Sequence, residues 1–560
     1  MALSASTTWE VRSTGVSTNG GGFDVGNANF DNTITATGAT GTAPVITWTN
    51  YTFVATDVGS LLFILSGTNW IPGFYPIVSV TNGTATLNAA IGAVQLYGGA
   101  TLLNTVAGCA TTASPTAGKG AIDYSQQNTG VSLISLSIDG TTNTTLAGST
   151  PTIGKAWVGN IINIPAGSGF TGQRVQVSSV TGTTATVDKS LGTLSSTGGT
   201  GVLGGALDGL GTLSSVMVAN NKAFIQTSGG YSSATTATFN AAGVDQSPTT
   251  PVTTLIGYTN IRGDSGMAVL TLSTNSGLTG LIFTNRGWRI RNITVNCNGL
   301  TTSTGFTLPQ YTDMYNCKVM NFGTYGINCT NTNILITKCE ITGGISTATG
   351  GINSGSSAFV RYCYIHNNAC NGIYSPTKDG LITKNLIAYN TGATSDGISI
   401  NNTLANVTDN IICNNGRSGI HIFAGGAQYL GIILNNLIAN NASYGIDLNQ
   451  NGFNALPLYD GNAYFNNTLG NRHYMDDIGT ICPVNGIAPY VNTHDVVLTA
   501  DPFIDVTNGD FRLNSNVGGG AACRGAGAPT TWPGNTLTVS APDIGAVQHA
   551  DTTVVSYWAK

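Results

Sequence analysis

The stretches ITKNLIAYN (382–390) and LNNLIANN (434–441) share one pattern, in which polar residues at a central position are followed by a short aliphatic run. The pattern recurs between Ile290 and Leu448, and its central position holds isoleucine, cysteine or asparagine. Successive central positions lie 24, 22, 24, 22, 25 and 26 residues apart: Ile293, Cys317, Cys339, Cys363, Asn385, Asn410 and Asn436. A period of about 24 residues with short apolar runs predicts a solenoid of stacked coils.

A glycine forms the second landmark of each repeat. It follows the central position by 9 or 12 residues, and an insertion of three residues leaves the next strand in register. The period is too short for a propeller blade, and the leucine-rich horseshoe pattern is absent. We therefore predict an all-β fold, a right-handed parallel β-helix solenoid with coils about 4.8 Å apart. The glycines are Gly305, Gly326, Gly351, Gly372, Gly397, Gly419 and Gly445.

Stacking of like residues on like residues follows from such a fold. We expect Cys317, Cys339 and Cys363 to form an internal ladder of free thiols, because parallel Cβ vectors suit a disulfide poorly. Asparagines should continue this ladder, because stacked amides can satisfy one another. We expect the glycines to occupy tight corners, where φ is often positive. The asparagines are Asn385, Asn410 and Asn436.

The N-terminal part contains a duplication with an offset of 100 residues. VGSLLFILSGTNW (58–70) aligns with VGNIINIPAGSGF (158–170), and alternating apolar runs separated by turns continue in both copies. Each copy predicts one small β module. The predicted organisation is a first segment with one module (1–120), a second module (121–205) and the β-helix with a C-terminal cap (206–560).

Composition limits the classes of function. Charged residues make up 8% of the 560 residues, against roughly 25% in ordinary globular proteins. Only 20 Lys and Arg, with a net charge of −5, leave no basic stripe for nucleic acid. No apolar run reaches about 18 residues, so we expect no membrane insertion. The N-terminus lacks the pattern of a secretory signal, so we expect synthesis in a cytoplasm.

The coils quoted above resemble the repeats of the pectate-lyase-like superfamily of right-handed parallel β-helices. The tail, with DPFID (501–505), NGDFRL (508–513) and DIGAVQ (543–548), resembles the closing segment of such proteins. The opening resembles phage-encoded members, in TWEVR (8–12), NGGGF (19–23) and DYSQQ (123–127). In those members the last two runs lie close together, whereas here about 100 residues separate them, which indicates an inserted module.

The resemblance implies a structural virion protein of a tailed bacteriophage, either a tail spike or fibre or a capsid decoration. We expect it to sit on the virion with other virion proteins, to form a homotrimer and to bind host-surface glycan. The alternative is a polysaccharide-degrading lyase or glycoside hydrolase. No active-site motif of these enzymes is found, and few charges make acid–base chemistry difficult, so we favour a protein that is not an enzyme. We expect no cofactor and no metal.

One outward column of the predicted β-helix is a candidate glycan-binding site. Asparagine, tyrosine, histidine and aspartate are residue types that bind sugar hydroxyls, and His421 beside Asp447 could act as an oriented base. The alternative is an ordinary solvated polar face, with Asp396 in a turn. The residues that follow each Gly-Ile pair are Asn328, Asn353, Tyr374, Ser399, His421 and Asp447, of which the last four form the candidate site.

A second outward column is apolar. Tyr364, Leu386, Ile411 and Leu437 each follow the ladder position by one residue and should point outward. Such a patch needs cover, either from a loop of the same chain or from a neighbouring subunit. We predict a subunit interface here, with the loop as the open alternative.

Three short motifs lie outside these two columns. Asp476-Asp477 near His473, and His494-Asp495, could cap the β-helix, contact a partner or bind calcium. Arg262-Gly263-Asp264 is expected to be a turn.

Overall fold

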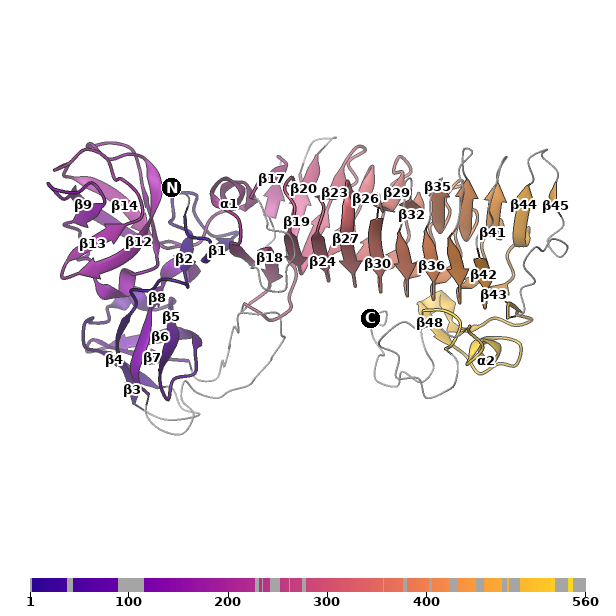
Figure 1. Cartoon of the computed structure of the whole chain (residues 1–560), viewed down its shortest axis with the longest axis horizontal. Coiled ribbons are helices and arrows are strands. Elements are labelled where there is room, and N and C mark those ends of the chain that lie inside the picture. Colours follow the sequence, from indigo (N-terminus) through magenta and orange to yellow (C-terminus); the bar gives the residue numbers. More distant parts are fainter. Residues whose placement is uncertain are drawn as a thin grey trace. The chain divides into compact units, whose positions relative to one another are not determined.

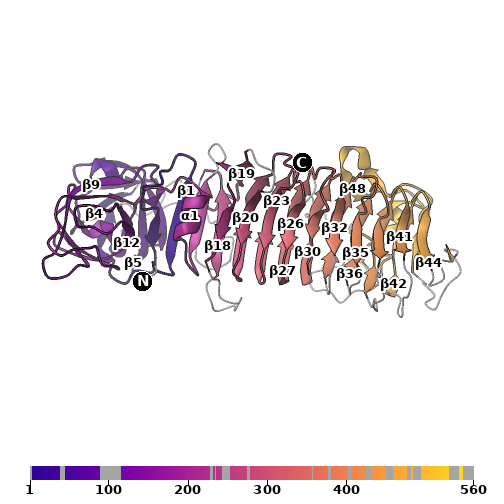
Figure 2. The same cartoon turned by 90° about the horizontal axis from the view of Figure 1, so that it is seen from above.

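The computed structural model describes most of the chain. The described residues are 3–37, 44–88, 115–226, 231–233, 235–241, 252–260, 262–273, 278–355, 357–375, 380–401, 405–423, 431–449, 458–475, 481–482, 494–528 and 542–546. The chain forms two compact units (Figures 1 and 2). The first comprises Met1–Tyr231, Asn240–Val244 and Thr249–Ala268, and the second comprises Ser232–Phe239, Asp245–Pro248 and Val269–Lys560.

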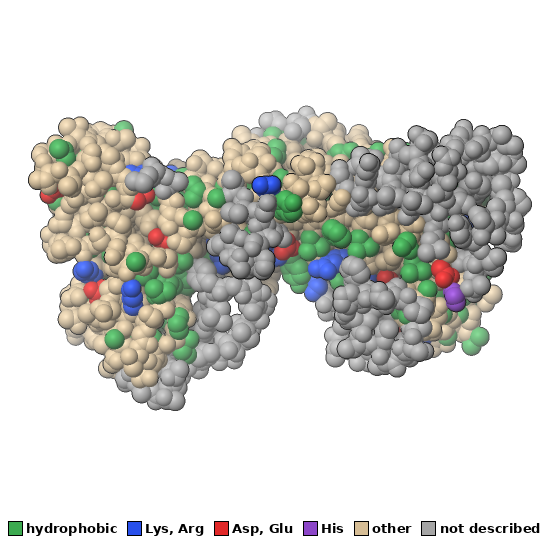
Figure 3. Space-filling model, viewed as in Figure 1, with side chains coloured by type: hydrophobic (Ala, Val, Ile, Leu, Met, Phe, Trp, Pro, Cys, Tyr) green, Lys and Arg blue, Asp and Glu red, His purple; other side chains and the backbone are tan. Residues whose placement is uncertain are grey.

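The surface reflects the unusual composition. Figure 3 shows mainly neutral polar side chains and backbone on the face in view, with small, separated groups of charged side chains. None of the described helices is long and apolar enough to cross a membrane.

Two closed six-stranded barrels dominate the first unit and confirm that the duplication encodes two β modules. Both barrels have the same strand order, and the bulges at Ser79 opposite Thr86 and at Ser179 opposite Thr186 match. The first barrel contains β3 (Asp31–Thr37), β4 (Val45–Trp48), β5 (Leu61–Thr68), β6 (Gly73–Thr81), β7 (Thr84–Leu87) and β8 (Thr116–Asp123). The second contains β9 (Val131–Ile138), β10 (Thr145–Ala147), β11 (Ile161–Ile164), β12 (Gln173–Thr181), β13 (Thr184–Val187) and β14 (Gly199–Leu203).

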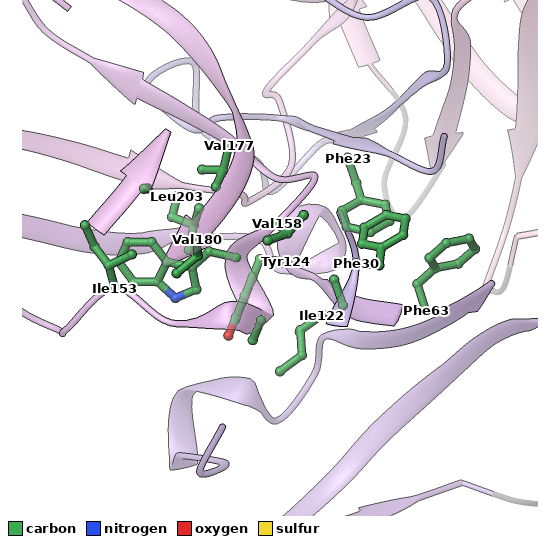
Figure 4. Close-up of a cluster of buried hydrophobic side chains, with 14 of the residues drawn as sticks. Phe23, Phe30, Phe63, Ile122, Tyr124, Ile153, Val158, Val177, Val180 and Leu203 are labelled. Atoms are coloured by element: carbon green, nitrogen blue, oxygen red, sulfur yellow. The ribbon is translucent and has the colours of Figure 1, made fainter. Parts of the chain in front are cut away.

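One hydrophobic core joins the barrels to the segments that flank them. Phe23 and Phe30, which precede the first barrel, pack with Tyr124 from the connection and Val158 from the second barrel (Figure 4). The remaining elements of this unit are β1 (Thr7–Arg12), β2 (Gly22–Asp24), α1 (Leu210–Val216), β15 (Lys222–Gln226) and β18 (Thr253–Tyr258), and short 3-10 turns at Ala55–Asp57, Tyr124–Gln126 and Lys155–Trp157. Strand β1 pairs in parallel with β15, which pairs in parallel with β18.

A buried ion cluster holds β1 to the turn that follows β18. The guanidinium of Arg262 contacts Glu10 at 2.8 Å and Asp123 at 3.4 Å, and all three side chains are buried. Burial raises the pKa of the Asp123 carboxyl, and the charge of Arg262 opposes this rise. Asp264 accepts backbone N–H groups of Thr259 and Gly266, so Arg262-Gly263-Asp264 is a turn, as predicted. The side chain of Arg262 is buried in the ion cluster.

The second unit is a right-handed parallel β-helix with three stacked sheets, as predicted (Figures 1 and 2). The first sheet contains β21 (Trp288–Arg291), β24 (Thr312–Tyr315), β27 (Thr332–Thr337), β30 (Ser357–Arg361), β33 (Leu381–Thr383), β36 (Asn406–Thr408), β39 (Ile432–Leu434) and β42 (Leu458–Asp460). The second contains β22 (Ile293–Asn296), β25 (Lys318–Met320), β28 (Glu340–Thr342), β31 (Tyr364–His366), β34 (Leu386–Ala388), β37 (Ile411–Cys413), β40 (Leu437–Ala439), β43 (Ala463–Phe465) and β46 (Val496–Val497).

The third sheet carries the predicted polar column. It contains β17 (Ala237–Phe239), β20 (Thr279–Phe283), β23 (Thr304–Leu308), β26 (Tyr325–Cys329), β29 (Gly350–Asn353), β32 (Asn371–Ser375), β35 (Ile398–Asn401), β38 (Ile420–Phe423), β41 (Tyr444–Asn449), β44 (Gly470–Met475) and β45 (Ile481–Cys482). All neighbouring strands of this sheet except the last pair, β44 and β45, are parallel. Two more strands, β16 (Tyr231–Ser233) and β19 (Ala268–Leu272), belong to the second sheet.

The internal ladder is confirmed in the structure. Cys317, Cys339 and Cys363 are buried free thiols, and burial raises the pKa of Cys317 and Cys339 well above the ordinary value. Along the asparagine ladder each side-chain amide donates to the side-chain oxygen of the next coil at 2.9–3.0 Å, and the ladder continues beyond the predicted residues to Asn462. The backbone N–H of Asn462 donates to Asp495, which ends the ladder.

A second asparagine ladder runs beside the first and was not predicted. The side-chain amides of Asn368, Asn390, Asn415 and Asn441 each donate to the asparagine of the next coil at 2.8–2.9 Å, and Asn467 accepts the last of these bonds. These asparagines lie five residues after the first ladder positions, at the other end of each second-sheet strand. The buried amides at both ends of each second-sheet strand therefore hold each coil in register with the next.

The predicted role of glycine needs correction. Asparagine, and in some coils Lys, Tyr or Asp, adopts positive φ at the corner before each ladder residue: Asn292, Asn316, Lys338, Tyr362, Lys384, Asp409 and Asn435. The repeat glycines lie instead where the third sheet begins. A Cβ at Gly397 would approach the carbonyl oxygen of Gly419 to 2.6 Å and Ile412 to 2.5 Å. Glycine is required there because the backbones approach closely, not because of φ.

The C-terminal segment covers the predicted apolar column. Leu386, Ile411 and Leu437 are buried in one cluster with Phe503 and Phe511 from the hairpin of β47 (Phe503–Asp505) and β48 (Asp510–Leu513). The short helix α2 (Gly520–Cys523) adds Cys523, and Tyr364 packs at the edge of the cluster. These three aliphatic side chains are therefore unavailable for a subunit interface, and the cover comes from the same chain, which was the alternative left open.

The ladder gives a stability prediction for the Asn410→Ala variant. Asn410 Oδ1 accepts both the backbone N–H and the side-chain amide of Asn385, each at 3.0 Å. Loss of this acceptor leaves two buried donors unsatisfied, each costing about 1–3 kcal/mol. We expect the free energy of unfolding, measured by chemical denaturation, to fall by at least about 2 kcal/mol.

The control is Asn353→Ala, which removes an outward, half-buried asparagine that donates to Asn328 at 2.8 Å. We expect this variant to lose under about 1 kcal/mol, because water can replace the lost partner. Equal losses in the two variants would contradict a special contribution from the buried ladder.

Candidate functional site

The predicted polar column lies on the third sheet in the expected register. Tyr374 pairs with Ser399, Ser399 with His421, and His421 with Asp447. The structure extends the column by one coil, because Asp447 pairs with His473 of β44. Tyr374 is half-buried, whereas Ser399, His421 and Asp447 are buried, so this end of the column is not the solvated face of the alternative interpretation.

His421 is held by the coil that precedes it. Its Nδ1 lies 3.1 Å from Asp396 Oδ2, and Arg417 contacts both His421 and Asp396. Arg417 Nε donates to Asp396 Oδ1 at 2.7 Å, and the backbone N–H of Ser418 donates to the same oxygen at 3.1 Å. The carboxylate that orients His421 is therefore Asp396, which sequence reasoning assigned to an ordinary turn, and not Asp447.

Asp447 orients a different histidine. His473 Nδ1 lies 2.7 Å from Asp447 Oδ1, and the ring of His473 stacks on Tyr444 with centroids 4.4 Å apart. Ser418 Oγ donates to Asp447 Oδ2 at 3.4 Å. Ser418 therefore contacts both carboxylates, so Asp396 and Asp447 lie close to each other on one side of the β-helix.

One polar atom of this cluster has no partner. Among the described residues, none hydrogen-bonds to His421 Nε2, although this atom is buried. The imidazole is fixed on its other side by Asp396 and Arg417, and Phe423 stacks against it with centroids 5.1 Å apart. A buried polar atom without a partner is unfavourable, and it is the feature here that points to a ligand.

Asp396 and Arg417 were missed because they do not share the position of the predicted column. Asp396 lies just before the glycine of its coil, and Arg417 lies in the connection that leads into the next coil. The sequence does show that Asp396 and Ser418 occupy equivalent positions, because each immediately precedes the repeat glycine of its coil. A search of the columns on both sides of the glycine would have found the pair.

The cluster has the components of acid–base chemistry but not the open arrangement of a glycosidase. Hydrolysis needs two carboxyl groups about 5–9.5 Å apart, one of them free to protonate the leaving group. Here Asp396 is bound to Arg417, and Asp447 is bound to His473. The atom with free hydrogen-bonding capacity is His421 Nε2, which suits a sugar hydroxyl or a proton transfer.

Other titratable groups of the β-helix lie away from this cluster. Glu340 on the second sheet binds Lys318 at 3.0 Å and His366 at 3.2 Å. Within the described ranges no group of three or more His, Cys, Asp or Glu residues is placed to hold a metal ion. Asp476 and Asp477, considered above for calcium, lie outside the described residues.

A comparison with protein families supports the β-helix. Residues 301–467 match the family model described as "Right handed beta helix region". This part of the chain is therefore a right-handed β-helix both by sequence and by its three parallel sheets. No curated protein matches the sequence.

Several solved structures are similar to the chain. Pectate lyase Pel9A is 14% identical over 62% of this chain and 91% of that chain, with a TM-score of 0.45. ORF18 of Geobacillus virus E2 is 12% identical over 48% and 57%, with a TM-score of 0.35. The periplasmic alginate epimerase AlgG is 12% identical over 50% and 70%, with a TM-score of 0.33.

The Glu340 pair predicts a pH dependence of stability. Burial would raise the pKa of Glu340, but hydrogen bonds from His366 and Lys318 outweigh it and lower the pKa from 4.5 to about 2. Because the pKa of Glu340 is lower in the folded state, its ionised carboxylate stabilises the fold fully above pH 4.5. This stabilisation is lost as the pH falls towards 2. We expect Glu340→Gln to be less stable than wild type at pH 6, by under about 1 kcal/mol.

The measurement is chemical denaturation of both proteins between pH 6 and pH 2.5. The two stabilities should converge as the pH falls, because protonated Glu340 resembles glutamine. A difference that stays constant, or grows with acidity, would contradict the assignment of the charged pair.

Proposed function

We propose that the chain is a glycan-binding β-helix that binds polysaccharide on its third sheet, across β32 to β44. The single observation that carries the proposal is the cluster around His421, whose buried Nε2 has no partner among the described residues. Half-buried rings of Tyr374, Phe423 and Tyr444 flank it and can stack on sugar rings. The coils repeat about every 4.8 Å, so successive coils can contact successive parts of an extended chain.

We further propose that the protein is displayed on the virion of a tailed phage, as a tail spike or fibre or a capsid decoration beside other virion proteins. Support comes from the opening segments that resemble phage proteins. Asn19 donates to the carbonyl oxygen of Asn128 at 2.8 Å and accepts from Gly130 at 3.1 Å, so the NGGGF and DYSQQ regions meet in space. The first barrel is the insertion between them, and the barrels would attach or space the β-helix on the particle.

A homotrimer remains part of the proposal, with a different contact surface from the predicted one. Leu335, Phe359 and Leu381 form an outward column on the first sheet, and Phe359 is 41% exposed. Figure 3 shows hydrophobic side chains gathered over the strands of this sheet. A mass measurement in solution tests the trimer, and a clean monomer at micromolar concentration would contradict it.

The second candidate function is polysaccharide cleavage by a phage tailspike. It is favoured by the oriented histidine and by the two carboxylates that share Ser418. It is disfavoured because each carboxylate already has a charged or histidine partner. Binding therefore has the stronger support.

The test is binding of bacterial envelope polysaccharides to His421→Ala. We expect affinity to fall at least about tenfold, because the variant removes the hydrogen-bonding atom at the centre of the site. The matched control is His366→Ala, which removes a histidine of the second sheet that is also paired with a carboxylate. This control should bind like wild type, and both variants should retain the β-sheet signal in circular dichroism.

Equal binding by His421→Ala and wild type would overturn the assignment of the site. The same incubations distinguish the two functions. Release of reducing ends or unsaturated sugars by wild type, and their loss in His421→Ala, would establish the enzymatic candidate instead.

A further inference from the structure

The charged side chains on the third sheet are few, and both arginines among them are already paired. In the described residues of β23 to β44, and in the residues that directly precede each strand, the acidic side chains are Asp396 and Asp447. The basic side chains of this region are Arg417 and Arg472. Arg417 binds Asp396, and Arg472 lies 3.8 Å from Asp495. Each arginine is therefore already paired with a carboxylate of the protein. Neither is available to neutralise the negative charge of a ligand.

The remaining carboxylate makes the site slightly acidic. Asp447 forms no salt bridge with an arginine or lysine among the described residues, although the charge of Arg417 acts on it, and it is bound by His473 and Ser418. The two carboxylates Asp396 and Asp447 therefore outnumber the one guanidinium of the cluster, Arg417. A uronate, phosphate or sulfate group placed here would lose its water without gaining a cation, which is strongly unfavourable.

Apart from Arg417 and Arg472, the described basic residues of the repeats lie on the other two sheets. They lie on or beside the first and second sheets, where several also pair with Asp313 or Glu340: Arg289, Arg291, Lys318, Lys338, Arg361 and Lys384. Besides the two carboxylates and two arginines named above, the third sheet therefore presents mainly hydroxyls, amides, imidazoles and aromatic rings. Such groups recognise sugars through hydrogen bonds and ring stacking, and not through charge.

We infer that the third sheet selects uncharged polysaccharide and rejects polymers rich in uronate, phosphate or sulfate. The inference rests on the proposed glycan-binding function and specifies its ligand class. Ser399, His421 and Asp447 supply hydrogen bonds to hydroxyl or acetamido groups, and Tyr374, Phe423 and Tyr444 supply stacking surfaces. The excess carboxylate keeps acidic chains away.

The experiment compares binding of the full chain to immobilised polysaccharides of two classes. The uncharged class contains glucans, mannans and N-acetylated hexosamine polymers, and the acidic class contains polygalacturonate, alginate and a teichoic acid. We expect binding to a member of the uncharged class at least about tenfold tighter than to any acidic polymer. That binding should change less than about twofold between 0.05 and 0.5 M NaCl, because salt screens only charged contacts.

Three outcomes are decisive in different ways. Tighter binding to an acidic polymer, or affinity that falls steeply with salt, overturns the inference and leaves the proposed function standing. Absence of binding to every polymer overturns the proposed function as well. Binding to an uncharged polymer that survives in Tyr374→Ala and His421→Ala places the ligand elsewhere and also overturns the inference.

Discussion

In-register stacking of coils is the constraint on which the β-helix depends. Within the three sheets, the interior strands pair in parallel with the equivalent strands of the coil before and the coil after, so stacked side chains stand about 4.8 Å apart. A column of like charges would repel at this distance, whereas a column of amides can satisfy itself. The two asparagine ladders use this property, because each Oδ1 accepts from the preceding coil and each amide before the last donates to the next asparagine. A chain with 8% charged residues is the consequence.

Stacking also creates surfaces that need to be closed. The first ladder would end with an unpaired backbone donor at Asn462, and Asp495 accepts it at 2.7 Å. The aliphatic column on the second sheet would face water, and Phe503 and Phe511 of the C-terminal hairpin cover it. Both covers come from residues well beyond the repeats in sequence. The non-repetitive end of the chain is therefore part of the β-helix energetically, although it has no coil of its own.

Periodicity made the fold and the register of the site predictable, because a period constrains every coil in the same way. The positions of Cys317, Asn410 and His421 follow from it directly. The errors concern what the period does not encode. Whether glycine is needed for positive φ or for close backbone approach depends on where the corner falls in the coil. At the corners before the ladder, positive φ is adopted mainly by asparagine, and the glycines lie where backbones approach closely. The cover of Leu386 and Ile411 and the pairing of Arg417 with Asp396 involve non-equivalent positions, which a repeat pattern cannot specify.

The same geometry explains how a chain with few charges can build the proposed glycan-binding site. His421 is oriented by Asp396 of the preceding coil, and His473 is oriented by Asp447 of the preceding coil, so each coil positions the functional group of the next. A single hydrogen bond to a sugar hydroxyl contributes little net free energy in water. Repetition along the axis lets one extended ligand contact several coils at once, and linked weak contacts add in affinity. Periodic polar contacts can therefore replace the concentrated charge that this sequence lacks.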